Sequence, residues 1–297
     1  MAPLRVPPGL CAAVREHCAA VAHSARWVRI DRDASIEPGG VSGLDAGLHY
    51  LDAGPEEIAR YVLVLDAINF GSGWFDTLRL PEGESGTEAL TRALTAHARA
   101  RGGTWSPGEL RTIEAAEVAE VLGQDPAHEL MRLYAEGLRQ LGAWLAGRGA
   151  LEVIAEAEGS AQRFAEMLAL GMPFFDDVGF YKRAQITAND LVLAGVAPFA
   201  DADLLTIFAD NLVPHVLRHS GVLEYAPELA ALVDAGEELA AGSPMEREIR
   251  GCAVHACELL ADRLGVAPRL LDNWLWNRGE RPPFSELPAH RTRTVFY

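Results

Sequence analysis

The chain has 297 residues, 49% of them hydrophobic, and a formal net charge of −16 at pH 7. This apolar content suffices for a full core and excludes a globally disordered chain. The negative field would repel a long polyanion such as duplex nucleic acid, and the scattered arginines form no strong basic patch, but a single small anion such as one phosphate remains compatible.

Targeting and cysteine signals are weak. The N-terminus lacks the basic region and the long apolar region of a signal peptide, and no run of about 18 apolar residues exists. Four cysteines, at positions 11, 18, 252 and 257, do not form a disulfide framework in a chain of this length, and the pair at 252 and 257 has poor spacing for zinc. We therefore expect a cytoplasmic protein, no membrane association, no metal site and buried structural cysteines.

Most of the chain has the apolar periodicity of helices. Three of the expected helices are preceded by a capping residue and begin with proline, at Ser106-Pro107, Asp125-Pro126 and Ser243-Pro244. The expected helices are 9–23, 55–66, 87–101, 107–121, 126–147, 151–170, 183–194, 203–220, 226–235, 244–264 and 268–277.

Strand signals are few and lie near the N-terminus. Residues 26–30 alternate in polarity, residues 49–51 are a candidate partner strand, and Leu63–Leu65 is a short apolar run. We therefore predict a mainly α fold with a small sheet. The expected division is an N-terminal part, residues 1–115, with the β element and an aromatic loop, and a closely packed helical part, residues 116–297.

The aromatic loop runs from Asn69 to Phe75. Its glycines, beside Trp74 and Phe75, would let it approach a flat ligand closely and offer stacking faces. It is not a phosphate-binding loop, because the glycine spacing and the Lys-Ser/Thr ending of such loops are absent. The alternative is an ordinary aromatic turn.

Lys182 is the single lysine among 26 basic residues. A helix that starts near Tyr181 would place Lys182 and Arg183 in its first turn, where cations oppose the helix dipole. A phosphate or carboxylate ligand would explain their position, since helix N-termini favour anions. The alternative is pairing with Asp176 or Asp177.

Asp210 is the acid with the most unusual surroundings. In a helix over 203–220 it would share a face with Ile207, Val213 and Leu217, and the other faces would also be apolar. An ionised carboxylate in such a buried helix is costly unless it is paired or does chemical work. The alternative, compatible with the first, is that Asp210 or Asn211 caps a helix whose first turn contains proline.

Other polar groups are less specific. Glu246 and Arg250 have the spacing of an ordinary helical ion pair, and Asp272 lies among apolar and aromatic residues. His215 and His219 lack a convincing third metal ligand and are better interpreted as packing and surface groups. The motifs of serine hydrolases and zinc proteases are absent.

Six ordered motifs together resemble the queuosine salvage protein family, whose members are queuosine 5′-phosphate N-glycosylases. The family patterns have Tyr and Asp where this chain has Asn211 and Asn277, which leaves fine substrate contacts open. The chain also resembles helix-hairpin-helix DNA glycosylases more faintly, because a helix, a hairpin and an acid follow one another in a similar order. This resemblance implies a helical glycosylase-like architecture. The motifs are N-F with W-F (69–75), F-Y-K-R-A-Q (180–185), F-A-D-x-x-V-P-x-V-L (208–217), E-I-R-G (248–251), L-D-x-x-L-W (271–276) and the segment 290–297.

The resemblance implies hydrolysis of queuosine 5′-phosphate, without a cofactor, to queuine for tRNA modification and ribose 5-phosphate. The implied partner is one small nucleotide, not a nucleic acid polymer, and the oligomeric state stays open. There are two alternatives: a non-catalytic binding protein for a modified nucleotide or base, and a glycosylase for another nucleoside or lesion. The resemblance implies Asp210 as the catalytic carboxylate and, for the substrate, Asn69, Trp74, Phe75, Lys182, Arg183, Asp190, Phe208, Asp272 and Trp276.

Overall fold

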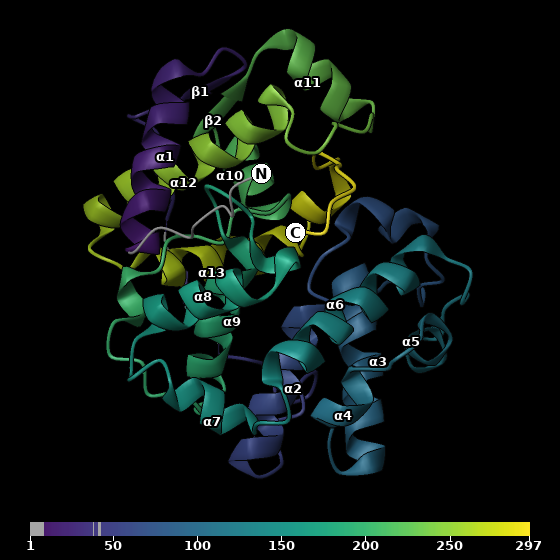
Figure 1. Ribbon diagram of the computed structural model, residues 1–297. Coiled ribbons are helices and arrows are strands. Elements are labelled where there is room, and N and C mark those ends of the chain that lie inside the picture. Colours follow the sequence, from purple (N-terminus) through teal and green to yellow (C-terminus); the bar gives the residue numbers. More distant parts are fainter. Residues whose placement is uncertain (1–8, 38, 41–42) are drawn as a thin grey trace, which may run out of the picture.

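The computed structural model describes residues 9–37, 39–40 and 43–297. Most of these residues are helical, and a single small antiparallel sheet accompanies the helices within the described chain (Figure 1). The prediction of a mainly α fold with a small sheet is therefore confirmed. The division near residue 115 stays a prediction.

The elements follow one another in chain order. The first half contains α1 (Leu10–Ser24), β1 (Val28–Ile30), α2 (Pro55–Ala67), η1 (Ser72–Thr77), α3 (Gly86–Arg101), α4 (Pro107–Leu110), α5 (Ala115–Leu122) and α6 (Glu129–Leu145). The second half contains α7 (Ala150–Ala155), α8 (Ala161–Gly171), η2 (Pro173–Phe175), α9 (Lys182–Leu193), η3 (Ala202–Leu204), α10 (Leu212–His219), β2 (Leu223–Tyr225), α11 (Pro227–Asp234), α12 (Pro244–Leu264), α13 (Pro268–Gly279) and η4 (Phe284–Glu286).

The sheet joins distant parts of the chain. Strand β1 pairs with β2, with Val28 opposite Tyr225 and Ile30 opposite Leu223. The strand predicted at 26–30 is confirmed, whereas the partner predicted at 49–51 is wrong. The strand predicted at Leu63–Leu65 is also wrong: this run lies inside α2, which packs against α6, α7 and α9 and is therefore apolar around most of its surface.

Two predicted helices are each divided in two. The segment 107–121 breaks between α4 and α5, where Ile113 is buried and its carbonyl accepts a hydrogen bond from Arg139. The segment 151–170 breaks where Glu158 and Gly159 both take positive φ, 52° and 78°. Neither break has a proline that would mark it in the sequence.

The predicted helix starts have mixed outcomes. Ser106 and Ser243 cap their helices through their side chains, as predicted. Asp125 does not cap α6, because that helix begins four residues later and His128 accepts the hydrogen bond of Leu130 N–H.

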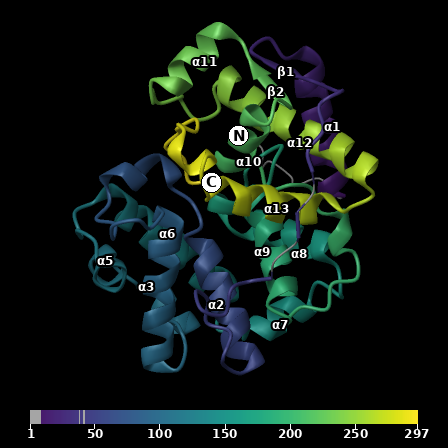
Figure 2. The same cartoon turned by 180° about the vertical axis from the view of Figure 1, so that it is seen from behind.

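The helices form two groups around a common centre. In Figures 1 and 2, α3 to α6 lie together on one side, α1 and α12 lie on the other, and α13 with the C-terminal segment lies between. Helix α1 packs on α12, α8 on α9, and α10 on α13. The site described below lies between α2, α3, α9 and α13.

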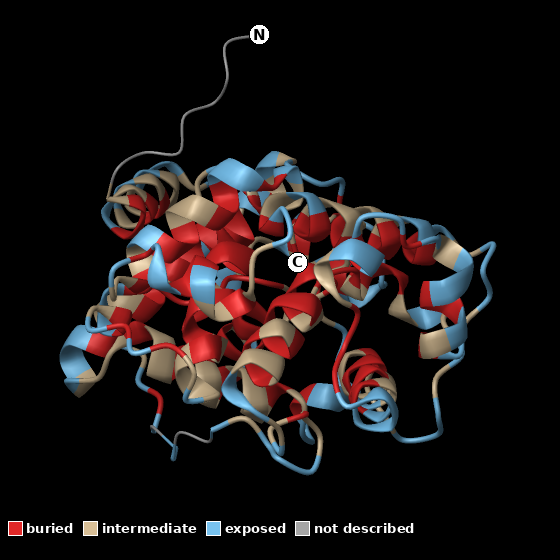
Figure 3. Ribbon diagram, turned by 60° about the horizontal axis from the view of Figure 1, so that its bottom comes forward, coloured by how far each residue is buried: buried red, intermediate tan, exposed pale blue. Residues whose placement is uncertain are grey.

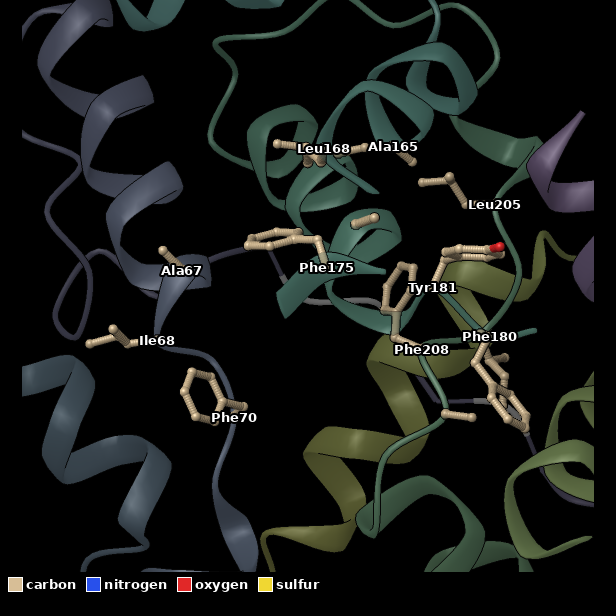
Figure 4. Close-up of a cluster of buried hydrophobic side chains, with 14 of the residues drawn as sticks. Ala67, Ile68, Phe70, Ala165, Leu168, Phe175, Phe180, Tyr181, Leu205 and Phe208 are labelled. Carbon is tan, nitrogen blue, oxygen red and sulfur yellow. The ribbon is translucent and has the colours of Figure 1, made fainter. Parts of the chain in front are cut away.

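The buried apolar residues form one cluster that reaches from Leu10 to Phe284. Figure 3 shows the buried residues in the middle of the molecule, and Figure 4 shows side chains of 67–70, 165–181 and 205–208 within the cluster. All four cysteines are buried and free, as predicted. No helix of the described ranges is both long and apolar enough to cross a membrane.

Replacing a core leucine should measure how tightly this cluster is packed. Leu138 in α6 is fully buried, so Leu138→Ala should lower the free energy of unfolding by about 2–5 kcal/mol through lost contacts and the cavity left behind. Leu170 in α8 is 64% exposed, so Leu170→Ala should change it by less than about 0.5 kcal/mol. Urea unfolding of both variants checks this, and equal effects would contradict it.

Candidate active site

One cavity of about 720 Å³ brings together residues from both ends of the chain. We call it the Asp210 cavity. Its volume is in the range of small-molecule sites. A second cavity of about 680 Å³, between α1 and the sheet, contains none of the predicted site residues. The predicted site residues that line the Asp210 cavity are Asn69, Phe75, Lys182, Asp190, Phe208, Asp210, Asp272 and Trp276.

Asp210 lies at the entry to α10, at the end of a non-helical stretch. Its Oδ1 accepts hydrogen bonds from the backbone N–H groups of Leu212, at 2.8 Å, and Val213, at 3.1 Å. The capping interpretation is therefore correct, and the predicted continuous helix over 203–220 is wrong, because the chain from Leu205 to Asp210 is not helical. Asp210 is 7% exposed and lines the cavity, and its side chain is fixed by the helix N-terminus.

Asp272 ties α13 to the segment that carries Asp210. Its Oδ1 accepts the N–H of Phe208 at 2.7 Å, two residues before Asp210. Burial, with a further contribution from the charge of Asp210, raises the pKa of Asp272 to about 8. At neutral pH this carboxyl group is therefore mainly protonated and can donate a hydrogen bond as well as accept one.

Asp66 and Asp190 form a second pair of carboxyl groups. Asp66, at the end of α2, is fully buried, and its Oδ1 accepts a hydrogen bond from Asn69 Nδ2 at 3.1 Å. Burial raises the pKa of Asp66 to about 6, and burial together with Asp66 raises the pKa of Asp190 well above its ordinary value. Asp66 is not among the predicted site residues, although its place directly after the apolar run 61–65 is a usable signal.

Lys182 is a cation placed among these acids. It begins α9, as predicted, and its Nζ lies 3.4 Å from both the backbone oxygen and the Oδ1 of Asn69. Burial lowers its pKa, while the carboxyl groups of Asp210, Asp66 and Asp272 act in the opposite direction. Among the described residues, neither Lys182 nor Arg183 forms a side-chain ion pair with Asp176 or Asp177.

Arg183 lies outside the lining of the cavity. It is fully buried, its guanidinium group donates to backbone carbonyls, and it lies over the rings of Phe70 and Phe175 at 4.6 and 4.4 Å. The acceptors are the carbonyl oxygens of Asp66, Ala67, Phe174 and Val295. With its donors used in this way, Arg183 joins α2, α9 and the C-terminal segment and is not directed at a ligand.

The aromatic loop also differs from its predicted arrangement. Trp74 is buried away from the cavity lining, and its Nε1 donates to Glu129. Gly71 N–H donates to the backbone oxygen of Tyr297, and a Cβ on Gly73 would lie 2.3 Å from the oxygen of Thr292. Gly73 therefore makes room for the C-terminal segment and not for a ligand, whereas a Cβ on Gly71 would meet Leu130. Tyr297, at the end of that segment, lines the cavity.

Two other interpretations can be compared with the structure. His215 is buried with its Nε2 2.9 Å from the oxygen of Phe284, and His219 is exposed, in agreement with packing and surface roles. Glu246 and Arg250 form the predicted helical ion pair, at 3.4 Å, but both are 2% exposed and Arg250 makes a shorter ion pair with Asp177, at 2.5 Å.

The cavity and its acids can now be compared with known proteins. The family model described as queuosine salvage protein matches residues 48–297. The chain belongs to the queuosine salvage protein family. The match includes every predicted site residue, but it assigns no role to any of them.

Proteins of this family from distant organisms share extended similarity with the chain. A queuosine 5′-phosphate N-glycosylase/hydrolase of Sphaerobacter thermophilus is 36% identical over 273 residues, which is 84% of each chain. One from Dictyostelium discoideum is 31% identical over 283 residues, 85% of each chain. One from Mus musculus is 33% identical over 177 residues, about half of each chain.

The protonation of Asp272 should appear in the pH dependence of stability. Its pKa rises from 3.8 to about 8 on folding, so the folded state holds a proton that the unfolded state has lost between these values. The resulting stabilisation is complete below about pH 4 and is lost as the pH rises through about 8. Asp272→Asn stays neutral and keeps an oxygen for Phe208 N–H, so it should remove this dependence.

Urea unfolding at pH 5, 6, 7 and 8 checks this expectation. The stability of the wild type should fall relative to Asp272→Asn, by at most about 1.4 kcal/mol per pH unit. A difference between the two proteins that stays constant with pH would contradict the protonated carboxyl group.

Proposed function

We propose that this protein hydrolyses the N-glycosidic bond of queuosine 5′-phosphate and releases queuine, for salvage into tRNA modification, and ribose 5-phosphate. The observation that carries the proposal is the carboxylate of Asp210, anchored at a helix N-terminus and lining a cavity with further acids. The similarity to relatives named for this activity, over most of both chains, supports it.

Asp210 acts on the sugar. Cleavage of an N-glycosidic bond builds positive charge on C1′ and the ring oxygen, and a carboxylate held in a poorly solvated site stabilises that charge more than one in water. Because two backbone N–H groups occupy Oδ1, Oδ2 can face C1′ or orient the attacking water. Water adds its oxygen to C1′ as the bond to the base breaks and gives up one proton, while the bonding electrons leave with the base, which takes up one proton.

The leaving base needs a proton donor. The queuine ring is a 7-deazapurine without N7, so the usual protonation point of a purine is missing. The pKa of Asp272, raised to about 8, supports a protonated carboxyl group at neutral pH, with one donor and one acceptor for the polar edge of the base. Burial also raises the pKa of Asp190, which lines the same cavity. Phe208, Phe75 and Trp276 provide apolar and aromatic surface in the same cavity for the faces of the ring.

Lys182 supplies the charge for the 5′-phosphate. It lines the cavity, whereas Arg183 has its donors occupied by backbone carbonyls. Protonation of Asp272 reduces the negative charge of the cavity, which makes a phosphate group beside Lys182 electrostatically acceptable. Asn69, in contact with both Lys182 and Asp66, orients the ammonium group.

Asp210→Asn should abolish most of the activity without unfolding the protein. The amide oxygen can still accept the N–H groups of Leu212 and Val213, but the negative charge is lost. We expect kcat for release of queuine from queuosine 5′-phosphate to fall at least about a hundredfold, or about 3 kcal/mol in barrier, with an unchanged melting temperature. Mass spectrometry of free queuine measures this.

The control is Asp234→Asn, which removes a half-exposed carboxylate paired with Arg218 outside the cavity. It should keep kcat within about twofold of the wild type. Wild-type protein that binds queuosine 5′-phosphate tightly and releases no base would replace the hydrolase by a binding protein. Full activity of Asp210→Asn would remove Asp210 from the mechanism.

Lys182→Met tests the phosphate contact. The variant keeps an unbranched chain and loses the ammonium group, so the preference for queuosine 5′-phosphate over queuosine, as a ratio of kcat/KM, should fall about ten- to a hundredfold. Arg281→Met is the comparison, because Arg281 also lines the cavity. A ratio that falls for Arg281→Met and not for Lys182→Met would assign the phosphate to Arg281.

A further inference from the structure

Arg250, in the middle of α12, is a buried cation with no place in the mechanism above. It is 2% exposed and lies over the rings of Phe180 and Tyr297, at 4.0 and 4.4 Å. Its Nη1 and Nη2 donate to the two oxygens of Asp177, at 3.2 and 2.5 Å, and Nη1 also reaches Glu246 at 3.4 Å. It is absent from the lining of the Asp210 cavity.

The remaining donor of this side chain points to the catalytic segment. Arg250 Nε donates to the carbonyl oxygen of Ala209 at 2.9 Å, and Ala209 directly precedes Asp210. The backbone of Asp210 is thereby held from two directions, by this contact before it and by the N-terminus of α10 after it.

The other partners of Arg250 belong to two further segments of the cavity wall. Asp177 lies five residues before Lys182, and its Oδ2 also accepts the backbone N–H of Lys182 at 3.4 Å. Tyr297 lines the cavity, and its hydroxyl donates to Glu246 at 2.9 Å. One guanidinium group therefore joins the three segments that carry Asp210, Lys182 and Tyr297.

Such a network is a poor device for stability alone. Desolvation of a buried cation and two carboxylates offsets much of their attraction, and well-packed apolar residues often stabilise a fold equally well. The planar guanidinium group, with its five donors, instead fixes the relative positions of several acceptors, because it holds them in one plane.

We propose that Arg250 is a positioning residue for the hydrolysis: it sets the placement of Asp210 relative to Lys182 and contacts no substrate. This inference rests on the proposed function. A misplacement of a reacting group by about 1 Å can cost about a hundredfold in rate, so loss of the guanidinium should lower kcat while the ligand-binding surface stays intact.

Arg250→Lys is the first variant, because lysine keeps the charge near Asp177 and lacks the Nε–H group that donates to Ala209. We expect kcat for queuosine 5′-phosphate to fall about ten- to a hundredfold, with KM and the Kd for queuine within about threefold of the wild type. The matched control is Arg218→Lys: Arg218 pairs with Asp234 and lies over Tyr225, away from Asp210, and its change should leave kcat within about twofold.

If Arg250→Lys has a much lower melting temperature than the wild type, Asp177→Asn still tests the positioning role of Arg250. It preserves shape and weakens the hold on Arg250, so kcat should fall about three- to tenfold, and the double variant should be no slower than Arg250→Lys, since both act through one network. Wild-type kcat in a folded Arg250→Lys protein, or full kcat in Asp177→Asn, would overturn the role of Arg250. Absence of queuine release by the wild type would be seen before any variant and would overturn the proposed function together with this role.

Discussion

The centre of this protein depends on how buried charge is satisfied. Carboxyl groups at positions 66, 177, 210, 246 and 272 and the cations Lys182, Arg183 and Arg250 are all less than 9% exposed. In a poorly polarisable interior, an acid must be paired, hydrogen-bonded or protonated. The structure uses all three solutions, and each is assigned to a different acid.

The buried charged residues divide into those that support the structure and those that face the cavity. Asp177 and Glu246 are neutralised by Arg250, while Arg183 is used entirely on backbone carbonyls. Asp210 is held by backbone N–H groups, and burial raises the pKa of Asp272. Asp190, Asp210 and Asp272, which line the cavity, form no ion pair with an arginine in the described chain, which leaves oxygens for a ligand.

The sequence predicted the helical class and most helices, and most of the predicted site residues line the cavity, for reasons that are local. Helix N-caps such as Ser106 and the start of α9 depend on a few adjacent residues, so they can be inferred from the chain alone. The partner strand of β1 could not be inferred in this way, since Leu223–Tyr225 is about 200 residues away and is only three residues long. Short apolar runs such as Leu63–Leu65 also do not distinguish a strand from a buried helix.

The same limit explains the misplaced site residues. Arg183 and Lys182 are adjacent in the first turn of α9, and periodicity cannot tell which one faces the cavity when both faces of the helix are buried. Trp74 and Arg250 have roles set by Glu129 and Asp177, partners that only tertiary packing brings near.

The contact between Gly71 and Tyr297 has a consequence for how the protein forms. These residues are more than 200 positions apart, and their hydrogen bond adds a wall to the cavity. Closing so long a loop is entropically costly and comes late, after local helices have formed. In a partly synthesised chain the cavity therefore lacks the part of its wall that Tyr297 supplies, and this part is added only once the segment at 290–297 has joined the fold.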